Sequence, residues 1–295
     1  MTLARATLAV ENYDLAATLG CGQAFRWRRA GPAWEGVVGS RWVRLRQERV
    51  GLCAETAGPV SDWQWLRDYL QTEVDLRQIL ATFPDDPPMR RSVEACRGLR
   101  LLRQEPWECL ASFICSSTKR IVQIEQIVAL LCRRFGQPLA VPAGTEPAWS
   151  FPSVERLAAA TEAELRQCKL GFRAPYLSAT ARKLAAGEAV LGRLPEMPLE
   201  EARAALLALP GVGVKIADCV LLFACGFQEA FPVDVWIIKA LRELYFPGRR
   251  PKLPRLRHFS RTHFGPHGGY AQQYLFHYMR TQRPPSKAGA IDHPG

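Results

Sequence analysis

A proline- and glycine-rich turn at residues 209–215 constrains the fold of this chain more than any other feature. The preceding residues, 200–209, are rich in Ala and Leu and predict a helix. Pro210 prevents that helix from continuing, because proline has no amide N–H and its ring clashes with the preceding turn. Gly211 and Gly213 then permit backbone angles and close approaches that a side chain would block. We therefore predict a pair of helices joined by a tight hairpin over residues 199–225.

The second helix of this hairpin is predicted to begin near Val214. Amide groups in the first turn of a helix have no intrahelical partner and point outward with the positive end of the helix dipole. They can hold a phosphate group without any contact to the rest of the ligand. A simple connection between two packed helices can have the same composition, so the turn alone leaves a purely structural role open.

Lys215 lies in the first turn of this second helix. Residues 216–223 are apolar on nearly every side of the helix, which predicts burial. A lysine amine has an ordinary pKa of about 10.4, and it becomes a nucleophile only where its surroundings favour the neutral form. The alternative is a lysine that binds phosphate or extends its amine to solvent, and the helix alone does not decide between the two.

Asp234 follows Pro232 and precedes an apolar helical segment at residues 235–244. Aspartate is a favoured N-cap residue, so this position has a purely structural explanation. Backbone amides and the helix dipole would also keep the carboxylate ionised, as an anion that faces a developing positive charge requires. Both interpretations need the same geometry.

The segment from Leu209 to Asp234 resembles the helix-hairpin-helix, Gly/Pro-rich loop and aspartate signature of the DNA glycosylase superfamily. Residues 213–219, with the sequence GVKIADC, narrow the resemblance to the 8-oxoguanine DNA glycosylases. Four further blocks resemble family blocks in the family's order, so the resemblance spans most of the chain. These blocks are residues 22–27, 108–117, 170–174 and 269–276.

The resemblance implies an enzyme that removes 8-oxoguanine from double-stranded DNA. In that family the lysine, here Lys215, attacks C1′ of the flipped nucleotide, and the aspartate, here Asp234, assists. The resulting Schiff base permits loss of the 3′ phosphate by β-elimination, which makes such an enzyme a bifunctional glycosylase and AP lyase. We expect a monomer whose chemistry needs no metal and no organic cofactor.

The resemblance also implies how the base is bound. A backbone carbonyl, assigned to Gly22, would accept the N7 hydrogen that 8-oxoguanine has and guanine lacks. Gln272 has the donors and the acceptor that suit the Watson–Crick edge of an extruded purine. Phe276 and Cys219 match the two residues that stack on opposite faces of the base, and Phe113 belongs to the same predicted base-binding set. Each of these side chains taken alone could be an ordinary core or surface residue.

DNA contacts are predicted at the hairpin and on three other segments. The predicted DNA-binding residues are Gly211, Gly213, Val214, Thr118, Lys119, Arg120, Arg173 and Trp236. Residues 118–120 stand where well-known family members have an asparagine tract that contacts the unpaired cytosine, so the preferred opposite base stays open. Arg173 still matches the arginine that addresses the cytosine. Trp236 replaces a histidine that touches the 5′ phosphate of the lesion, so a neighbouring group has to supply that contact or it is lost.

The charge of the chain fits a polyanionic partner, because a net charge of +11 favours electrostatic binding to DNA without sequence selection. The nine cysteines form no CxxC pair and the N-terminus lacks an apolar signal segment. We therefore expect reduced thiols and an intracellular, DNA-associated protein without a membrane partner, in the cytoplasm or nucleoid, or in the nucleus of a eukaryote. No cysteine follows Cys225, which excludes the four-cysteine iron-sulfur loop that related glycosylases carry near the carboxyl end.

Hydrophobic periodicity predicts an α+β fold with two domains. The predicted strands, which form an antiparallel meander, are residues 25–28, 34–38, 43–46 and 52–55. From Asp62 onward the period is helical, apart from a predicted loop at residues 138–152. We expect an N-terminal antiparallel β-sheet domain with flanking helices over residues 1–98. It would pack on a mostly helical helix-hairpin-helix glycosylase domain over residues 99–282, followed by a loose tail over residues 283–295.

Two other functions stay open at this point. A related alkylpurine or other purine-lesion glycosylase would share the architecture and the aspartate, but alkylpurine enzymes lack the lysine, so Lys215 argues against that class. A non-catalytic helix-hairpin-helix module would use Lys215 only to contact phosphate. Trapping of a covalent intermediate with DNA separates an enzyme from such a module.

Overall fold

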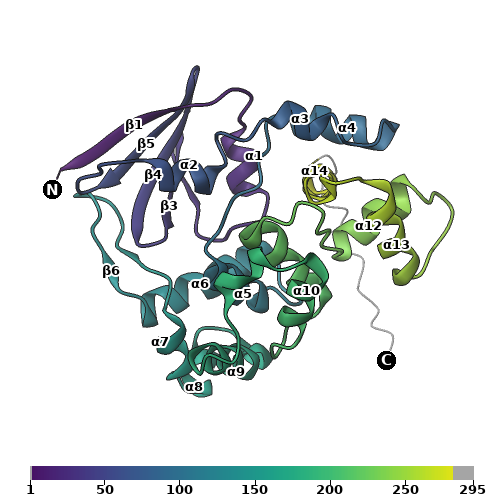
Figure 1. Cartoon of the computed structure of the whole chain (residues 1–295). Helices are drawn as coiled ribbons and strands as arrows, with labels where there is room; N and C mark the ends of the chain where they lie inside the picture. Colours follow the sequence, from purple (N-terminus) through teal and green to yellow (C-terminus); the bar gives the residue numbers. More distant parts are fainter. Residues whose placement is uncertain (1, 282–295) are drawn as a thin grey trace, which may run out of the picture.

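A five-stranded antiparallel sheet forms the N-terminal side of the molecule (Figure 1). The computed structural model describes residues 2–281. The strands are β1 (Leu3–Ala9), β2 (Arg28–Ala30), β3 (Ala33–Val38), β4 (Arg41–Glu48) and β5 (Gly51–Ala57). Their order in the sheet is β1-β5-β4-β3-β2, and every neighbouring pair is antiparallel. The predicted antiparallel sheet is confirmed.

Two parts of the sheet differ from the prediction. The sequence pattern does not predict β1, which pairs with β5 along its whole length. The strand predicted at residues 25–28 is wrong, because β2 begins only at Arg28. Phe25 and Trp27 enter two different cores: the Phe25 ring packs against Phe113 with centroids 5.4 Å apart, whereas Trp27 Nε1 donates to the Tyr69 hydroxyl at 2.8 Å. A segment that crosses from one core to the other cannot continue the ladder.

The rest of the chain is mostly helical, as predicted. Its α-helices, with the one in the sheet region, are α1 (Leu15–Gly20), α2 (Gln64–Leu70), α3 (Leu76–Leu80), α4 (Pro87–Ala95), α5 (Pro106–Cys115), α6 (Ile121–Phe135), α7 (Val154–Ala158), α8 (Glu162–Gln167), α9 (Ala174–Ala185), α10 (Leu199–Leu207), α11 (Val214–Val220), α12 (Val235–Leu244), α13 (Leu253–His263) and α14 (Gly268–Thr281). Short 3₁₀ turns are η1 (Gly171–Arg173) and η2 (Leu191–Glu196), and η3 (Leu221–Cys225) is a π-helical continuation of α11.

The helix boundaries around the hairpin agree with the prediction in part. The start of α11 at Val214 is where the sequence places it, and α12 has the predicted bounds. Helix α10 ends at Leu207 rather than at Leu209, so the hairpin turn is longer than predicted. The predicted loop at residues 138–152 contains a two-stranded ladder of β6 (Pro138–Leu139) and β7 (Ala148–Trp149), which the sequence pattern does not show.

Two hydrophobic cores lie under these layers. The smaller one joins the sheet to α1 and α2, and the larger one runs through α5, α6, α9, α11 and α14. The Phe25 and Leu76 side chains belong to the larger core, so the helical part extends beneath the N-terminal residues. The domain boundary between residues 98 and 99 stays a prediction, and the predicted tail at residues 283–295 lies outside the described residues.

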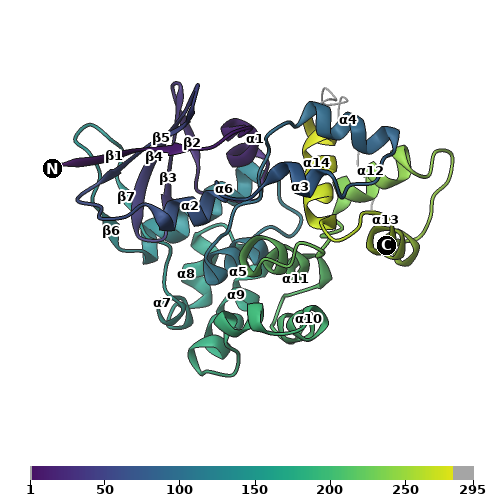
Figure 2. The same ribbon diagram turned by 45° about the horizontal axis from the view of Figure 1, so that its top comes forward.

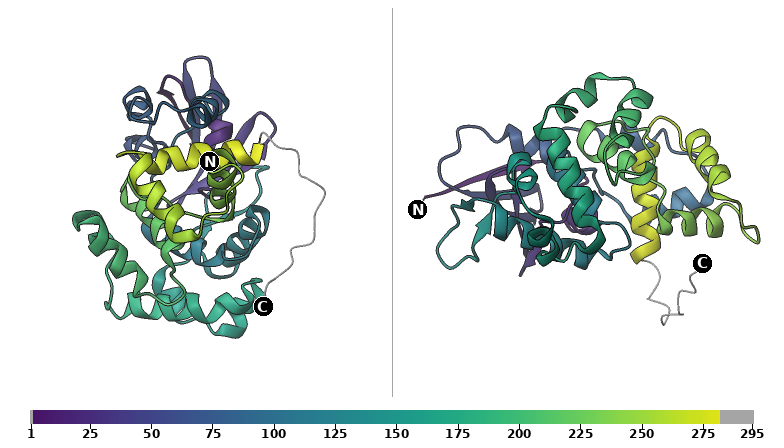
Figure 3. Two further views of the ribbon diagram at one scale, coloured as in Figure 1. Left: turned by 90° about the vertical axis from the view of Figure 1, so that its right-hand side faces the viewer. Right: turned by 90° about the horizontal axis from the view of Figure 1, so that it is seen from below.

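Helix α14, at the end of the described chain, packs against elements from much earlier in the sequence. It packs against α4 and α12 (Figure 2), and the Tyr274 hydroxyl donates to the Leu99 carbonyl at 3.1 Å. Seen from below, the strands occupy one end of the molecule, and α14 lies toward the other end with α12 and α13 (Figure 3, right). Within residues 2–281, none of the helices combines the length and apolar character needed to cross a membrane.

Candidate active site

The hairpin between α10 and α11 presents exposed backbone at its turn. Gly213 is the N-cap of α11, and no side chain caps this helix. Gly211 has a φ of +75°, and a Cβ there would lie 2.6 Å from Cβ of Tyr176. The Thr180 hydroxyl of α9 fixes the turn by donating a hydrogen bond to the Pro210 carbonyl at 2.8 Å. The amides of the first turn of α11 thus have no side-chain cap, and the contact with phosphate that the sequence suggests stays a prediction.

A buried ion pair joins the two helices of the hairpin. Arg203 of α10 and Asp218 of α11 lie 2.9 Å apart, with side chains only 8% and 9% exposed. Burial raises the pKa of Asp218, and the Arg203 guanidinium opposes that rise. Since Asp218 lies one turn after Lys215, this pair fixes the helix that carries the amine relative to α10.

Removal of Arg203 should destabilise the fold. In Arg203→Met, the carboxylate of Asp218 stays buried without its hydrogen-bonded partner, which costs about 3 kcal/mol of unfolding free energy. Urea unfolding measures the loss. The control is Arg77→Met, because the Arg77–Glu11 pair is 76% and 83% exposed, and its removal should cost less than about 1 kcal/mol. Equal losses in the two variants would contradict a structural role for the buried pair.

The amine of Lys215 points toward protein groups rather than away from them. Its Nζ donates to the Ser116 hydroxyl at 3.2 Å and lies 4.8 Å from the centroid of the Phe113 ring. Phe113 is 3% exposed and stacks on Phe223 with centroids 5.7 Å apart. Phe113 is thus the buried floor beneath the amine, and its proposed contact with a base stays a prediction.

Cys219 lies one turn after Lys215 and is 3% exposed. Burial raises the pKa of its thiol to about 12, and the neighbouring Lys215 opposes this rise. The thiol is therefore neutral at physiological pH. A neutral, polarisable sulfur suits contact with the face of a base and does not suit nucleophilic attack.

Asp234 is the N-cap of α12, as the sequence predicts, and its Oδ1 accepts a hydrogen bond from the Ile237 amide at 2.8 Å. Burial raises the pKa of this carboxyl above its ordinary value. The Ile237 amide and the charge of Lys215 both oppose that rise, which places the carboxylate and the amine in each other's electrostatic field. The helix start and the Lys215 cation therefore favour the ionised form that burial disfavours.

One face of α14 carries three side chains at helical spacing. Gln272, Phe276 and Arg280 follow one another at four-residue intervals. Gln272 is 4% exposed, and its Oε1 has no hydrogen-bond partner among the described residues. The Arg280 guanidinium lies 5.3 Å from the centroid of the Phe276 ring. A buried acceptor without a partner is costly, and a purine edge is a partner of the right chemistry.

Hydrogen bonds of the Gln23 side chain fix the turn at Gly22. Gly22 has a φ of +82°, which favours glycine. Gln23 is fully buried, and its Nε2 donates to the carbonyls of Thr18 and Arg100 at 2.9 and 2.8 Å. Its Oε1 accepts from the Leu102 amide at 2.8 Å. This satisfied network holds the backbone on which lesion recognition is predicted.

The predicted contacts to the opposite strand are not all exposed. Arg173 is 3% exposed, and its guanidinium donates to the carbonyls of Leu170 and Ser117 and to the Thr118 hydroxyl. Thr118 has a φ of +55° and is exposed, as is Arg120. Arg173 therefore supports the turn at Thr118 from inside the protein, and its contact with the opposite base stays a prediction.

Trp236 lies at the exposed start of α12, beside Asp234. It is 38% exposed, and Lys239 Nζ lies 5.6 Å from the centroid of its ring. The neighbouring Val235 is 75% exposed. The surface next to the carboxylate therefore combines apolar, aromatic and cationic side chains, and the contact of Trp236 with DNA stays a prediction.

Two residues of the site were not predicted individually. Ser116 lies within the block at residues 108–117, and its contact with Lys215 depends on the packing of α5 against α11. Arg280 lies outside all the blocks that carry the resemblance. Its signal was the spacing: it follows Gln272 and Phe276 on the same face of α14.

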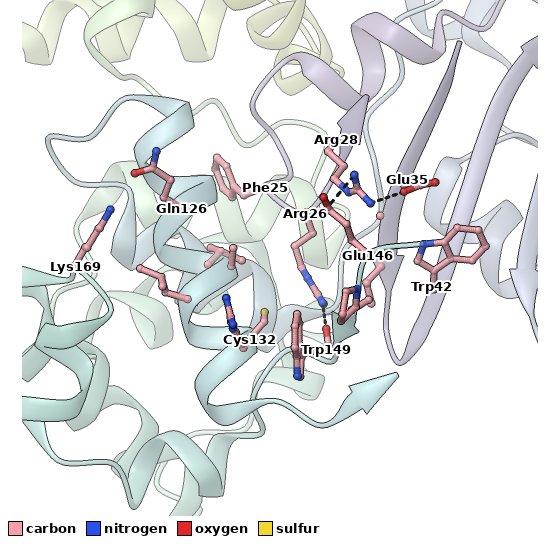
Figure 4. A pocket seen from close by; sticks show the side chains of 18 residues that line it. Phe25, Arg26, Arg28, Glu35, Trp42, Gln126, Cys132, Glu146, Trp149 and Lys169 are labelled. Atoms are coloured by element: carbon pink, nitrogen blue, oxygen red, sulfur yellow. Dashed lines mark hydrogen bonds and ion pairs between the residues drawn. The ribbon is translucent and has the colours of Figure 1, made fainter. Parts of the chain in front are cut away.

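A separate cavity of 480 Å³ lies between the sheet and α6 (Figure 4). None of the predicted site residues lines it. Two of its arginines are paired within the protein: Arg28 pairs with Glu35 at 2.6 Å and Arg26 pairs with Glu108 at 3.2 Å. Among residues 2–281, no three or more His, Cys, Asp or Glu side chains are grouped so that they could hold a metal ion.

Comparisons with known proteins agree with this geometry. Residues 5–110 match the N-terminal domain of 8-oxoguanine DNA glycosylase, and residues 111–261 match the HhH-GPD superfamily of base excision DNA repair proteins. The chain is 36% identical over 276 residues to an N-glycosylase/DNA lyase of Arabidopsis thaliana. The aligned region covers 88% of this chain and 75% of that protein.

Solved structures give the same result. The 8-oxoguanine glycosylase/lyase of Clostridium acetobutylicum, bound to double-stranded DNA with cytosine opposite 8-oxoguanine, superposes with a TM-score of 0.88 at 31% identity. The match covers 96% of this chain and 98% of that one. A 3-methyladenine DNA glycosylase of Archaeoglobus fulgidus, at a TM-score of 0.78 and 22% identity, shares the fold alone. The chain belongs to the 8-oxoguanine DNA glycosylases of the helix-hairpin-helix base excision repair superfamily.

Proposed function

We propose that this protein excises 8-oxoguanine from duplex DNA and then cleaves the strand, with Lys215 as the nucleophile and Asp234 as its electrostatic partner. The observation that carries the assignment is the position of the Lys215 amine. It lies at the start of the hairpin's second helix, over the Phe113 ring and in the field of the Asp234 carboxylate. A lysine that only contacted backbone phosphates would not need this inward position.

The first chemical step replaces one bond to C1′ with another. Lys215 first loses a proton to solvent, and its neutral amine then forms a bond to C1′ while the glycosidic bond breaks and its electron pair leaves with the base. The new nitrogen–carbon adduct gives up a second proton and the departing base takes one up, so the base leaves as a neutral molecule. Positive charge develops on the sugar in this step. The Asp234 carboxylate stabilises that charge from the N-cap of α12.

The second step follows from the bond that Lys215 has formed. Opening of the sugar ring converts the adduct into a Schiff base, in which nitrogen is doubly bonded to C1′. A proton passes from C2′ to solvent, its electron pair forms the C2′–C3′ double bond, and the 3′ phosphate leaves with the electrons of the C3′–O bond, which cleaves the strand. This sequence accounts for both the glycosylase and the lyase activity through one amine.

The remaining predicted residues serve recognition in this proposal. The base enters beside Gly22, Cys219, Gln272 and Phe276, at an unstacking cost of a few kcal/mol. The unpaired Oε1 of Gln272 and the neutral thiol of Cys219 support that role. Hairpin residues Gly211, Gly213 and Val214 hold a phosphate through backbone amides, together with the cationic and aromatic surfaces at residues 118–120 and at Trp236. The protein then works where cellular DNA is, inside the cell.

Borohydride trapping tests the proposal. Reduction of the Schiff base joins the protein irreversibly to DNA, so the wild-type protein should form a covalent adduct with duplex that contains 8-oxoguanine opposite cytosine. Undamaged duplex of the same sequence is the control and should form none. Tight binding of both duplexes without any adduct would overturn the proposal and favour a non-catalytic DNA-binding module.

A further inference from the structure

Arg280 lies where three parts of the site meet, although no proposed step uses it. Its guanidinium donates to the carbonyl of Cys21 at 3.3 Å and lies against the Phe276 ring. A Cβ placed on Gly22 would be 3.5 Å from the same guanidinium nitrogen. Arg280 therefore links the base-binding face of α14 to the turn at Gly22.

We propose that Arg280 is a positioning residue for lesion recognition, which fixes the peptide between Cys21 and Gly22 against α14. This inference rests on the proposed function, because it concerns the turn whose carbonyl is assigned to the lesion. A glycine at a φ of +82° has few steric limits of its own, so the direction of its carbonyl depends on the groups that hold the neighbouring peptides.

The turn is held from two sides, and Arg280 supplies one of them. Gln23 fixes the following residue from the sheet side, through its bonds to Thr18, Arg100 and Leu102. On the α14 side, the Cys21 carbonyl accepts from both Gln273 Nε2 and Arg280, each at 3.3 Å. The two donors lie seven residues apart on one helix, so they clamp a single oxygen from α14.

The third wall of this turn is α6. A Cβ on Gly22 would meet Ile121 Cδ1 at 2.3 Å, so the Ile121 side chain covers the turn closely. Glu125, one turn further along α6, lies in the electrostatic field of Arg280. The contacts with the Cys21 carbonyl and the Phe276 ring therefore orient the guanidinium. The charges of Asp234 and Glu125 favour its cationic form.

Arg280 acts on recognition more than on the reacting groups. Among the groups that oppose the rise in the pKa of Asp234, the Ile237 amide and Lys215 have larger effects than Arg280. Loss of the guanidinium should therefore weaken base recognition and leave the Lys215 chemistry nearly intact. Strand cleavage at an abasic site depends on the Lys215 amine but not on recognition of a base by the turn at Gly22. A duplex that contains an abasic site therefore separates the two effects.

The test compares Arg280→Gln with the wild-type protein on two duplexes. We expect the single-turnover rate of 8-oxoguanine excision to fall about 10- to 100-fold, as for a misplaced recognition group. Strand cleavage at an abasic site in the same sequence should stay within about threefold of wild type. Gln273→Leu removes the other donor to the Cys21 carbonyl and should show the same selective loss. Arg255→Gln is the matched control, because Arg255 lies on α13, is exposed and stacks on Phe246.

Three results would overturn the inference. Equal losses on both duplexes would mean that Arg280 supports the whole fold or the chemistry. Unchanged excision would mean that the turn does not depend on it. A uniform loss of affinity for damaged, abasic and undamaged DNA, with a smaller salt dependence, would make Arg280 a phosphate contact instead. A wild-type protein that excises nothing would contradict the proposed function itself, before any comparison of variants.

Discussion

Replacement of Lys215 with Gln should abolish base excision and covalent trapping together. The amide of glutamine cannot attack C1′ or form a Schiff base, and the side chain stays polar although it is one atom shorter than that of lysine. We expect the single-turnover rate of 8-oxoguanine excision to fall on the order of 10³-fold or more, as when other covalent nucleophiles are removed. Gel analysis of excision, with and without borohydride, measures both losses.

Lys215→Arg separates catalysis from charge. Arginine keeps the positive charge next to the hairpin and can still bind phosphate, but it is always protonated and is no nucleophile. We expect wild-type affinity for the 8-oxoguanine duplex within about threefold and no adduct. Lys183→Gln, on the surface of α9 and paired with Glu188, is the control and should excise normally. Substantial excision by either Lys215 variant would show that another group attacks the sugar.

The hairpin and the N-cap of α12 could be predicted because their causes are local. Pro210 and the two glycines define the turn by backbone chemistry, and Asp234 marks a helix start by its hydrogen bond to Ile237. These signals need no knowledge of the rest of the fold. Residue type alone therefore identified Lys215 and Asp234 as candidate site residues. The structure adds that the charge of Lys215 acts on the Asp234 carboxylate.

The errors in the sheet come from long-range packing. Alternation at Phe25 and Trp27 resembles a strand, but it does not show that the two rings enter different cores. Strand β1 depends on its register with β5, which begins far along the chain at Gly51. Periodicity reports which side chains are buried and does not report what buries them.

The convergence of the site could not be predicted from local patterns either. The contact of Ser116 with Lys215 depends on the packing of α5, and the contact of Arg280 with the turn at Gly22 depends on the packing of α14. Likewise, the sequence around Arg173 does not reveal that its guanidinium donates hydrogen bonds to the carbonyls of Leu170 and Ser117. Family resemblance supplied the set of recognition residues, and the structure adds the contacts that support them.

Asp234→Asn should retain DNA binding and lose most of the excision activity. Asparagine is as good an N-cap as aspartate, so α12 and its bond to the Ile237 amide should be preserved. The variant lacks the negative charge that faces the developing positive sugar. Loss of one such electrostatic group typically costs about 10²- to 10³-fold in rate, which single-turnover excision with 8-oxoguanine opposite cytosine would measure.

The pH profile gives an independent measurement of the same carboxylate. Burial raises the pKa of Asp234, so its charge is lost on acidification at a higher pH than for an exposed aspartate. Wild-type excision should therefore fall as the pH drops through this raised value, and the residual activity of Asp234→Asn should lack that acid limb. Asp75→Asn, which changes the exposed N-cap of α3, is the matched control and should retain both the rate and the limb. Near-normal turnover by Asp234→Asn would mean that Asp234 only caps α12.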